Sequence, residues 1–266
     1  MSAARLLKLL AARGCPWAAP IESFDVIEST NDVLRERARR GAPAWSVIFA
    51  GSQTAGRGRR GHAWSSPPGN LYMSLLLAPP ARPETHSLVP LVAGLAVAES
   101  LVEFGVETRL KWPNDVLAAG RKLAGVLAEA SSFGDATDWI ALGVGVNVAV
   151  DPGPVAPGLE SGATSIAMVS GARPELLDVA AAVLVRLHDR YADLEAGSTR
   201  ALLDAWRARS VPWWGRAIEV VAGGQLVRGI ALDVDAAGGL MLRLPDGGRE
   251  TILAGEAREL RLGGAC

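Results

Sequence analysis

Residues 88–102 form the longest apolar stretch of the chain, and this stretch sets the first limit on the fold. It is about 15 residues long and is interrupted by Pro90 and Glu99, whereas a membrane span needs about 18 apolar residues. We therefore expect no membrane association. The stretch should instead belong to a helix over residues 85–104 that is buried in the core of a domain.

Strand-like and helical segments alternate around this helix. Residue content and apolar periodicity predict strands at 21–27, 45–50, 71–77, 106–112, 122–130 and 139–148. Helices are predicted at 5–13, 174–195 and 199–209, and from Thr30 to Gly41, where Ser29 or Thr30 would cap the helix. Residues 151–162 are rich in Pro and Gly and should form a loop. This order predicts an α+β domain with a central sheet flanked by helices.

The sequence changes character near Val211. Short strand-like runs at 217–221, 226–233, 240–244 and 250–253 are separated by pairs of glycines. This spacing is typical of a small all-β barrel. We therefore expect a short extension over residues 1–20, a main domain over 21–210 and a small β domain over 211–266.

Composition narrows the class of function. The 27 basic and 28 acidic side chains nearly cancel, so the chain lacks the overall positive charge of a nucleic-acid-binding protein. Cys15 and Cys266 lie near opposite ends, and no Cys or His has metal-ligand spacing, which argues against a disulfide framework and a zinc module. We expect a cytoplasmic protein that meets any anionic ligand through local charges.

The segment Gly56-Arg57-Gly58-Arg59-Arg60-Gly61 is the first candidate site. It matches G-x-G-x-x-G, but a dinucleotide-binding loop needs a helix that begins within the glycines, and Pro67-Pro68-Gly69 follows too soon for one. A Rossmann oxidoreductase is therefore not expected. Three guanidinium groups on a glycine-rich loop can instead close over phosphate or carboxylate oxygens. A solvated surface turn is the alternative.

Two lysines mark a second candidate site. Only three of the 27 basic residues are lysines, and two of them lie in Lys111-Trp112-Pro113-Asn114-Asp115 and Arg121-Lys122-Leu123-Ala124-Gly125. An ammonium is a compact charge that can follow a carboxylate as it becomes an acyl phosphate. An ordinary surface lysine is the alternative. Gly143-Val144-Gly145-Val146-Asn147 and Ser29-Thr30-Asn31 are weaker signals, because close backbone approach and a helix cap explain them equally well.

Taken in order, these motifs resemble those of the bacterial biotin-protein ligases. The resemblance implies a central mixed β-sheet flanked by helices, as in biotin and lipoate ligases, followed by an SH3-like C-terminal β-barrel. It also implies a reaction in which biotin and ATP, with Mg²⁺, give biotinyl-5'-AMP and pyrophosphate. Biotin is then transferred to a lysine of the biotin carboxyl carrier domain of acetyl-CoA carboxylase or a related carboxylase.

The resemblance also implies a role for each matching residue. Biotin would contact Ser29, Thr30, Asn31, Gln53, Arg57, Gly58, Arg59, Lys122 and Gly125. ATP would contact Arg59, Arg60, His62, Trp64, Asn114, Asp115 and Asn147, with Asp115 also as the Mg²⁺ ligand. The catalytic residues would be Lys122, Arg57 and Arg59, with Lys122 at the reacting carboxylate.

Two departures from the family pattern carry expectations. The family often has arginine at the position of His62, so ATP affinity should vary with pH near neutrality. Only about 20 residues precede the main domain, which leaves no room for a winged helix-turn-helix and predicts a monofunctional ligase without specific DNA binding. A homodimer that pairs through the strand at 139–148 is a further hypothesis, as is a carrier contact near residues 256–261.

Two other functions are weighed against the biotin ligase. A lipoate or octanoate ligase on the same fold is the nearest alternative, although the arginine loop favours biotin. A nucleic-acid-binding regulator is the alternative from another class. It is disfavoured because the C-terminal segment mixes acidic residues with its arginines and offers no aromatic stacking platform.

Overall fold

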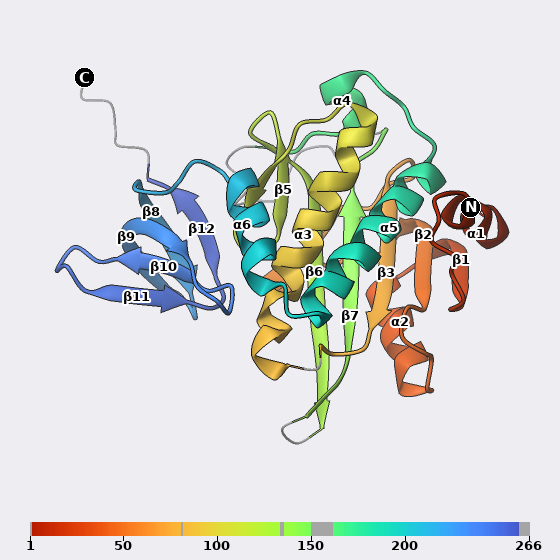
Figure 1. Ribbon diagram of the computed structural model, residues 1–266. Coiled ribbons are helices and arrows are strands. Elements are labelled where there is room, and N and C mark those ends of the chain that lie inside the picture. Colours follow the sequence, from red (N-terminus) through yellow and green to blue (C-terminus); the bar gives the residue numbers. More distant parts are fainter. Residues whose placement is uncertain (1, 81, 134–135, 150–161, 261–266) are drawn as a thin grey trace.

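The computed structural model describes residues 2–80, 82–133, 136–149 and 162–260 (Figure 1). The larger sheet is built from β1 (Ile21–Ile27), β2 (Val47–Gln53), β3 (Leu71–Leu77), β4 (Arg109–Lys111), β5 (Asp115–Ala118), β6 (Arg121–Phe133) and β7 (Ala136–Val146). Its strand order is β1-β2-β3-β7-β6-β5-β4. β1 and β2 run parallel and the other neighbours antiparallel, so the sheet is mixed, as the resemblance implied.

Helices cover both faces of this sheet. α2 (Thr30–Arg39) packs on one face, where Leu34 meets Ile48, Leu76 and Ala141. The main core lies on the other face, beneath α3 (Val89–Ser100) and α5 (Leu176–Glu195), with α1 (Ala3–Ala12) and α6 (Thr199–Arg209) beside them. All seven residues of β3 are consequently buried.

The expected core helix is confirmed. α3 is flanked by two short 3₁₀ helices, Pro83–Leu88 and Leu101–Phe104. The combined stretch Pro83–Phe104 is long and apolar enough to cross a membrane, but 67% of its most apolar window is buried inside the protein. Such burial is what the core helix of a folded domain shows.

The predicted strand at 106–112 is wrong for most of its length. Only Arg109–Lys111 forms a strand: residues 106–108 precede it without regular structure, and at its other end the chain turns at Trp112-Pro113-Asn114 and returns as β5, with Lys111 paired to Asp115. Proline has no backbone N–H for a sheet hydrogen bond, which explains why the strand stops there. The hairpin strand β5 and the short helix α4 (Ile166–Ser170) were not predicted, and residues 151–161 of the expected loop lie outside the described residues.

The strand proposed for homodimer pairing does not lie at a sheet edge. β7 is paired to β3 on one side, from Ile140 to Val146, and to β6 on the other. Its backbone groups over this stretch are already used in the sheet, so the hypothesis that residues 139–148 form an edge for a second subunit is wrong. The edge strands of the described sheet are β1 and β4.

The C-terminal part forms a second, antiparallel sheet, in agreement with the predicted small β domain. It contains β8 (Ala217–Ala222), β9 (Gln225–Val234), β10 (Leu240–Arg243), β11 (Arg249–Ile252) and β12 (Glu256–Glu259), in the order β11-β10-β9-β8-β12. The sheet lies beside α6 (Figure 1). The Trp112 indole joins it to the larger sheet by donating to the Gly238 carbonyl at 2.9 Å, and Arg207 of α6 pairs with Asp233 at 2.5 Å.

Candidate active site

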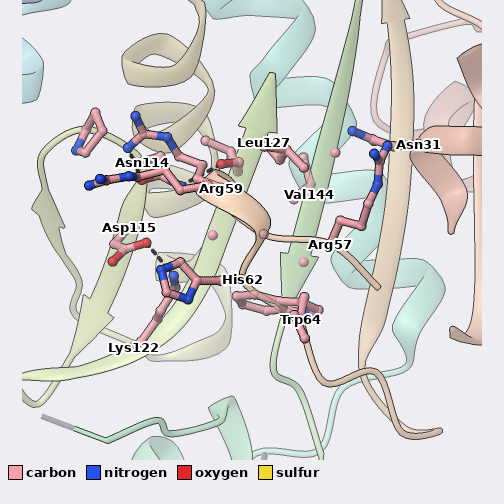
Figure 2. Close-up of a pocket in the computed structure, with 18 of the residues that line it drawn as sticks. Asn31, Arg57, Arg59, His62, Trp64, Asn114, Asp115, Lys122, Leu127 and Val144 are labelled. Atoms are coloured by element: carbon pink, nitrogen blue, oxygen red, sulfur yellow. Dashed lines mark hydrogen bonds and ion pairs between the residues drawn. The ribbon is translucent and has the colours of Figure 1, made fainter. Parts of the chain in front are cut away.

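One cavity gathers the predicted site residues. It lies against β3, β5, β6 and β7, beneath the arginine loop (residues 56–62), and its empty space, counted together with the open solvent at its mouth, is about 1120 Å³. Every predicted site residue except Asn147 lines it: Ser29, Thr30, Asn31, Gln53, Arg57, Gly58, Arg59, Arg60, His62, Trp64, Asn114, Asp115, Lys122 and Gly125. Several of these are drawn in Figure 2.

A network of neutral polar groups forms one end of the cavity. Thr30 donates its backbone N–H and its hydroxyl to Gln53 Oε1, at 2.8 and 3.1 Å. Gln53 Nε2 donates to Ser66 Oγ at 2.8 Å. The buried Ser74 Oγ lies 2.7 Å from Thr30 Oγ1 and 2.5 Å from Asn31 Oδ1. These contacts fix several donors and acceptors without placing a net charge at this end.

The expectation that Ser29 or Thr30 caps α2 through its side chain is wrong. Ser29 occupies the N-cap position, but its side chain makes no capping hydrogen bond. The Thr30 amide is satisfied instead by Gln53 Oε1, which comes from the end of β2. The start of α2 is therefore stabilised by a residue that also lines the cavity, so the helix end and the pocket depend on each other.

Cations gather at the opposite end of the cavity. Lys122 Nζ lies 2.6 Å from Asp115 Oδ1, and both side chains are only 15% exposed. The same ammonium lies 5.3 Å from the centre of the Trp64 ring. The pairing of β5 with β6 sets this arrangement, because it brings Asp115 opposite Gly125. Figure 2 shows Asp115 and Lys122 across the cavity from Asn31.

Arg59 connects this cationic end to the C-terminal sheet. Its Nη1 donates to Asn114 Oδ1 at 3.2 Å and to the Gly255 carbonyl at 3.1 Å. Burial lowers the pKa of the Arg59 guanidinium, and the charge of Asp115 acts in the opposite direction. Arg60 Nη1 donates to the Val221 carbonyl at 2.8 Å. Two arginines of the loop are thus positioned by the C-terminal sheet.

The C-terminal sheet also contributes residues to the cavity. Gly255 and Glu256 both line it. Glu256 does begin the segment 256–261 in which a carrier contact was expected, and Arg261 of that segment lies outside the described residues. No sequence signal had marked Gly255.

The arginine loop folds as a narrow hairpin. Gly58 N donates to the His62 carbonyl at 2.7 Å and Trp64 N to the Gly56 carbonyl at 2.9 Å. Gly56 is required at its position, because a Cβ there would lie 2.4 Å from the Trp64 carbonyl oxygen. No long helix follows the glycines, as expected from the prolines, so this loop is not a dinucleotide-binding turn.

Glycines form the wall between the two ends. A Cβ on Gly145 would lie 2.7 Å from the Trp64 ring, and one on Gly125 would lie 3.2 Å from both Trp64 and Lys122. A Cβ on Gly143 would lie 2.6 Å from Asn31 Oδ1. The sequence had indicated close backbone approach at Gly143 and Gly145 but not what approaches them.

Two residues differ from their expected placement. Asn147 does not line the cavity; it is buried just after the end of β7, where its Nδ2 donates to the Thr164 carbonyl at 2.9 Å. Lys111 does line the cavity, with its Nζ 5.9 Å from the Trp213 ring centre, although only Lys122 had been assigned a role. Among the described residues, no group of three or more His, Cys, Asp or Glu side chains could hold a metal ion by itself.

Two family models match the chain. The biotin/lipoate A/B protein ligase family matches residues 23–147, and the biotin protein ligase C terminal domain matches residues 214–257. These regions contain the larger sheet with the arginine loop and most of the second sheet.

Curated relatives show the same similarity. The biotin--[acetyl-CoA-carboxylase] ligase of Mycobacterium tuberculosis is 38% identical over 244 residues, which cover 88% of this chain and 86% of that protein. The bifunctional ligase/repressor BirA of Bacillus subtilis is 34% identical over 171 residues, 64% of this chain. That match covers 53% of the Bacillus protein, so the chain spans about half the length of this relative.

Solved structures extend the similarity to the fold. The biotin protein ligase of Aquifex aeolicus, in complex with biotin and ATP, has a TM-score of 0.77 and 27% identity, and the match covers 91% of this chain and 99% of that one. The Leishmania major ligase in complex with biotinyl-5-AMP has a TM-score of 0.61 and 25% identity, covering 88% and 98% of the two chains.

Proposed function

The chain belongs to the biotin protein ligase family, and from this premise we propose that it activates biotin with ATP and transfers it to a biotin carboxyl carrier protein. The observation that carries the proposal is the division of the cavity. Neutral polar groups of Thr30 and Gln53 lie at one end, and the cations Lys122 and Arg59 lie at the other. A ligand with a neutral polar head and a carboxylate that becomes joined to phosphate matches this division.

The neutral end favours biotin over lipoate and octanoate. Thr30 and Gln53 present fixed hydroxyl and amide groups to the cavity, which suit the ureido ring of biotin because that ring both donates and accepts hydrogen bonds. The dithiolane ring of lipoate and the alkyl end of octanoate could not use the hydrogen-bonding capacity that Thr30 and Gln53 keep beyond their contacts within the protein. A site built for polar partners rejects such ligands strongly.

The cationic end suits the first chemical step. A carboxylate oxygen of biotin attacks the α-phosphorus of ATP, an O–P bond forms, the bond to the β-phosphate oxygen breaks, and pyrophosphate leaves. Lys122 and Arg59 offset the repulsion between the carboxylate and the phosphates. Asp115 and the Trp64 ring hold the Lys122 ammonium in place.

Mg²⁺ fits the carboxylates available at this end. Asp115 and Glu256 line the cavity, and magnesium typically uses one or two carboxylates together with substrate phosphates and water. Asp115, with Glu256 as a second donor, would hold the ion, which would supply further positive charge to the phosphates.

The second step, transfer of biotin to the carrier lysine, requires that the mouth of the cavity be open to the carrier. The amine of the carrier lysine attacks the acyl carbon, a C–N bond forms, the C–O bond to the phosphate breaks, and AMP leaves while the amine loses a proton. We assign the loop residues Arg59 and Arg60, together with Glu256, to the rim that the carrier approaches.

Other properties follow as parts of the same proposal. We place the catalytic unit at 21–210 and the accessory β unit at 211–266, consistent with the two sheets. The near balance of 27 basic and 28 acidic residues supports a ligase that binds no specific DNA sequence, and the presence of only two cysteines supports a ligase that acts in the reducing cytoplasm.

The test is biotin-dependent exchange of pyrophosphate into ATP with Mg²⁺, with lipoate and octanoate as parallel substrates. Lys122→Ala should reduce exchange by about a hundredfold or more, the usual loss when one charge-stabilising group is removed. Lys8→Ala is the matched control, since Lys8 is an exposed lysine of α1 and should leave exchange unchanged. Exchange with lipoate or octanoate in place of biotin would overturn the substrate assignment.

A further inference from the structure

We propose that Glu129 is a positioning residue that couples the neutral end of the cavity to the arginine loop. This inference deepens the proposed function and depends on it. Glu129 lies on β6, is absent from the lining of the cavity, and belongs to none of the motifs that indicated the site.

A single carboxylate oxygen makes both connections. Glu129 Oε2 accepts a hydrogen bond from Asn31 Nδ2 at 2.8 Å and another from Arg57 Nη2 at 2.9 Å. Arg35 Nη1 lies 3.6 Å from the other oxygen, Oε1. The carboxylate is 26% exposed, so water screens it only in part. Asn31 and Arg57 are thus held to each other through one charged atom.

These contacts fix the orientation of the Asn31 amide. An ionised carboxylate can only accept hydrogen bonds, so the Asn31 nitrogen must face Glu129 and its oxygen must face Ser74, 2.5 Å away. Gly143 leaves no spare room, because even a Cβ there would lie 2.6 Å from the Asn31 oxygen. Without the Glu129 charge, an acceptor-only partner would no longer fix the orientation of the Asn31 amide.

The contact with Glu129 also gives Arg57 a different role from Arg59. Arg57 is held by Glu129 and by Asp32 Oδ1, 2.6 Å away, so its charge is balanced within the protein. Figure 2 shows Arg57 extending toward Asn31, whereas Arg59 lies across the cavity beside Asn114. Arg57 therefore anchors the loop over the neutral end, while Arg59 serves the phosphate end.

This arrangement predicts an effect on biotin binding rather than on the chemical step. In Glu129→Gln the shape is kept but the charge that holds Arg57 is lost. We expect the KM for biotin in pyrophosphate exchange to rise by about tenfold or more, the usual effect of losing a hydrogen bond to a charged group. The kcat should stay close to that of the unmodified protein, because Lys122 and Arg59 are untouched.

Loop order gives a second measurement that does not depend on activity. Trypsin cleaves after arginine, so the rate of cleavage within residues 57–61, followed by mass spectrometry, reports how often the loop detaches. Glu129→Gln should accelerate this cleavage. Glu36→Gln is the control, because Glu36 is an acidic residue of α2 that pairs with Arg39 and Arg40, away from the cavity, and should change neither measurement.

Asp32→Asn separates coupling from simple loss of an ion pair. This substitution removes the ion pair between Asp32 and Arg57 but keeps the hydrogen bond from Asn31 to Glu129. It should accelerate cleavage yet raise the KM for biotin less than Glu129→Gln does. Equal KM values for the two variants, or a Glu129→Gln protein with unchanged KM and cleavage, would overturn the proposal. If the unmodified protein shows no biotin-dependent exchange, the proposed function fails, and the cleavage rates still decide whether Glu129 holds the loop.

Discussion

Replacing Gly145 with alanine should weaken ligand binding in the cavity while leaving the fold intact. The added Cβ would lie 2.7 Å from Cε2, 2.8 Å from Cζ2 and 2.9 Å from Nε1 of Trp64. Carbon atoms pack at about 3.5 Å or more, so the indole must move by about 0.8 Å. Gly145 lies in β7 without a positive φ, so the alanine itself is not strained there.

The size of the effect follows from the overpacking. Forcing a methyl group into a filled space costs about 1–3 kcal/mol, equivalent to about a 5- to 150-fold change in an equilibrium. Within the described part of the chain, the Trp64 indole N–H has no hydrogen-bond partner, so moving the ring breaks no such bond. Trp64 forms part of the cavity, so the cost should fall mainly on ligand binding.

The assay is pyrophosphate exchange together with a thermal unfolding scan. The Gly145→Ala protein should show kcat/KM for biotin and for ATP lowered by about tenfold to a hundredfold, with a small change in Tm. The control is Gly94→Ala in α3, where the Cβ would meet Leu110 at an ordinary 3.6 Å and alanine also favours the helix. Gly94→Ala should leave exchange unchanged.

A double variant identifies the cause. If the contact with Trp64 is responsible, Gly145→Ala should have little further effect in a Trp64→Ala protein, because the clashing ring is gone. Wild-type kcat/KM in the single variant would refute the reasoning. Fully additive losses in the double variant would also refute it.

Two further predictions concern stability. Glu99→Gln should lower the free energy of unfolding in urea by about 2 kcal/mol, because Glu99 is 10% exposed and holds Arg190 through two hydrogen bonds; no change in the urea midpoint would contradict this. Burial raises the pKa of Glu219, but hydrogen bonds from Arg258 and Arg228 outweigh it and lower that pKa below the ordinary 4.5. The resulting stabilisation is complete above pH 4.5 and is lost as the pH falls below it. In the Glu219→Gln protein the free energy of unfolding should therefore depend less on pH below 4.5 than in the unmodified protein. The same pH dependence in both proteins would disprove this prediction.

Local sequence patterns were sufficient for much of the fold. Apolar periodicity and length predicted α3, α5 and α6, and the prolines after the arginine loop correctly excluded a dinucleotide-binding turn. The same patterns failed at the β4–β5 hairpin. There, three residues reverse the chain directly after Lys111, and the returning strand β5 was not predicted because it is only four residues long.

The sequence by itself determined which segments form helices and strands and which of them must be buried, because steric preference and hydrophobicity act within a few residues of each other. Only the tertiary structure decided the partners of the polar groups. Thr30 finds Gln53 23 positions away, Asn31 finds Glu129 98 positions away, and Arg59 reaches Gly255 196 positions away. A polar side chain of given type can satisfy its hydrogen bonds in many ways, and burial cost selects among them only once the packed chain has brought particular groups within about 3 Å.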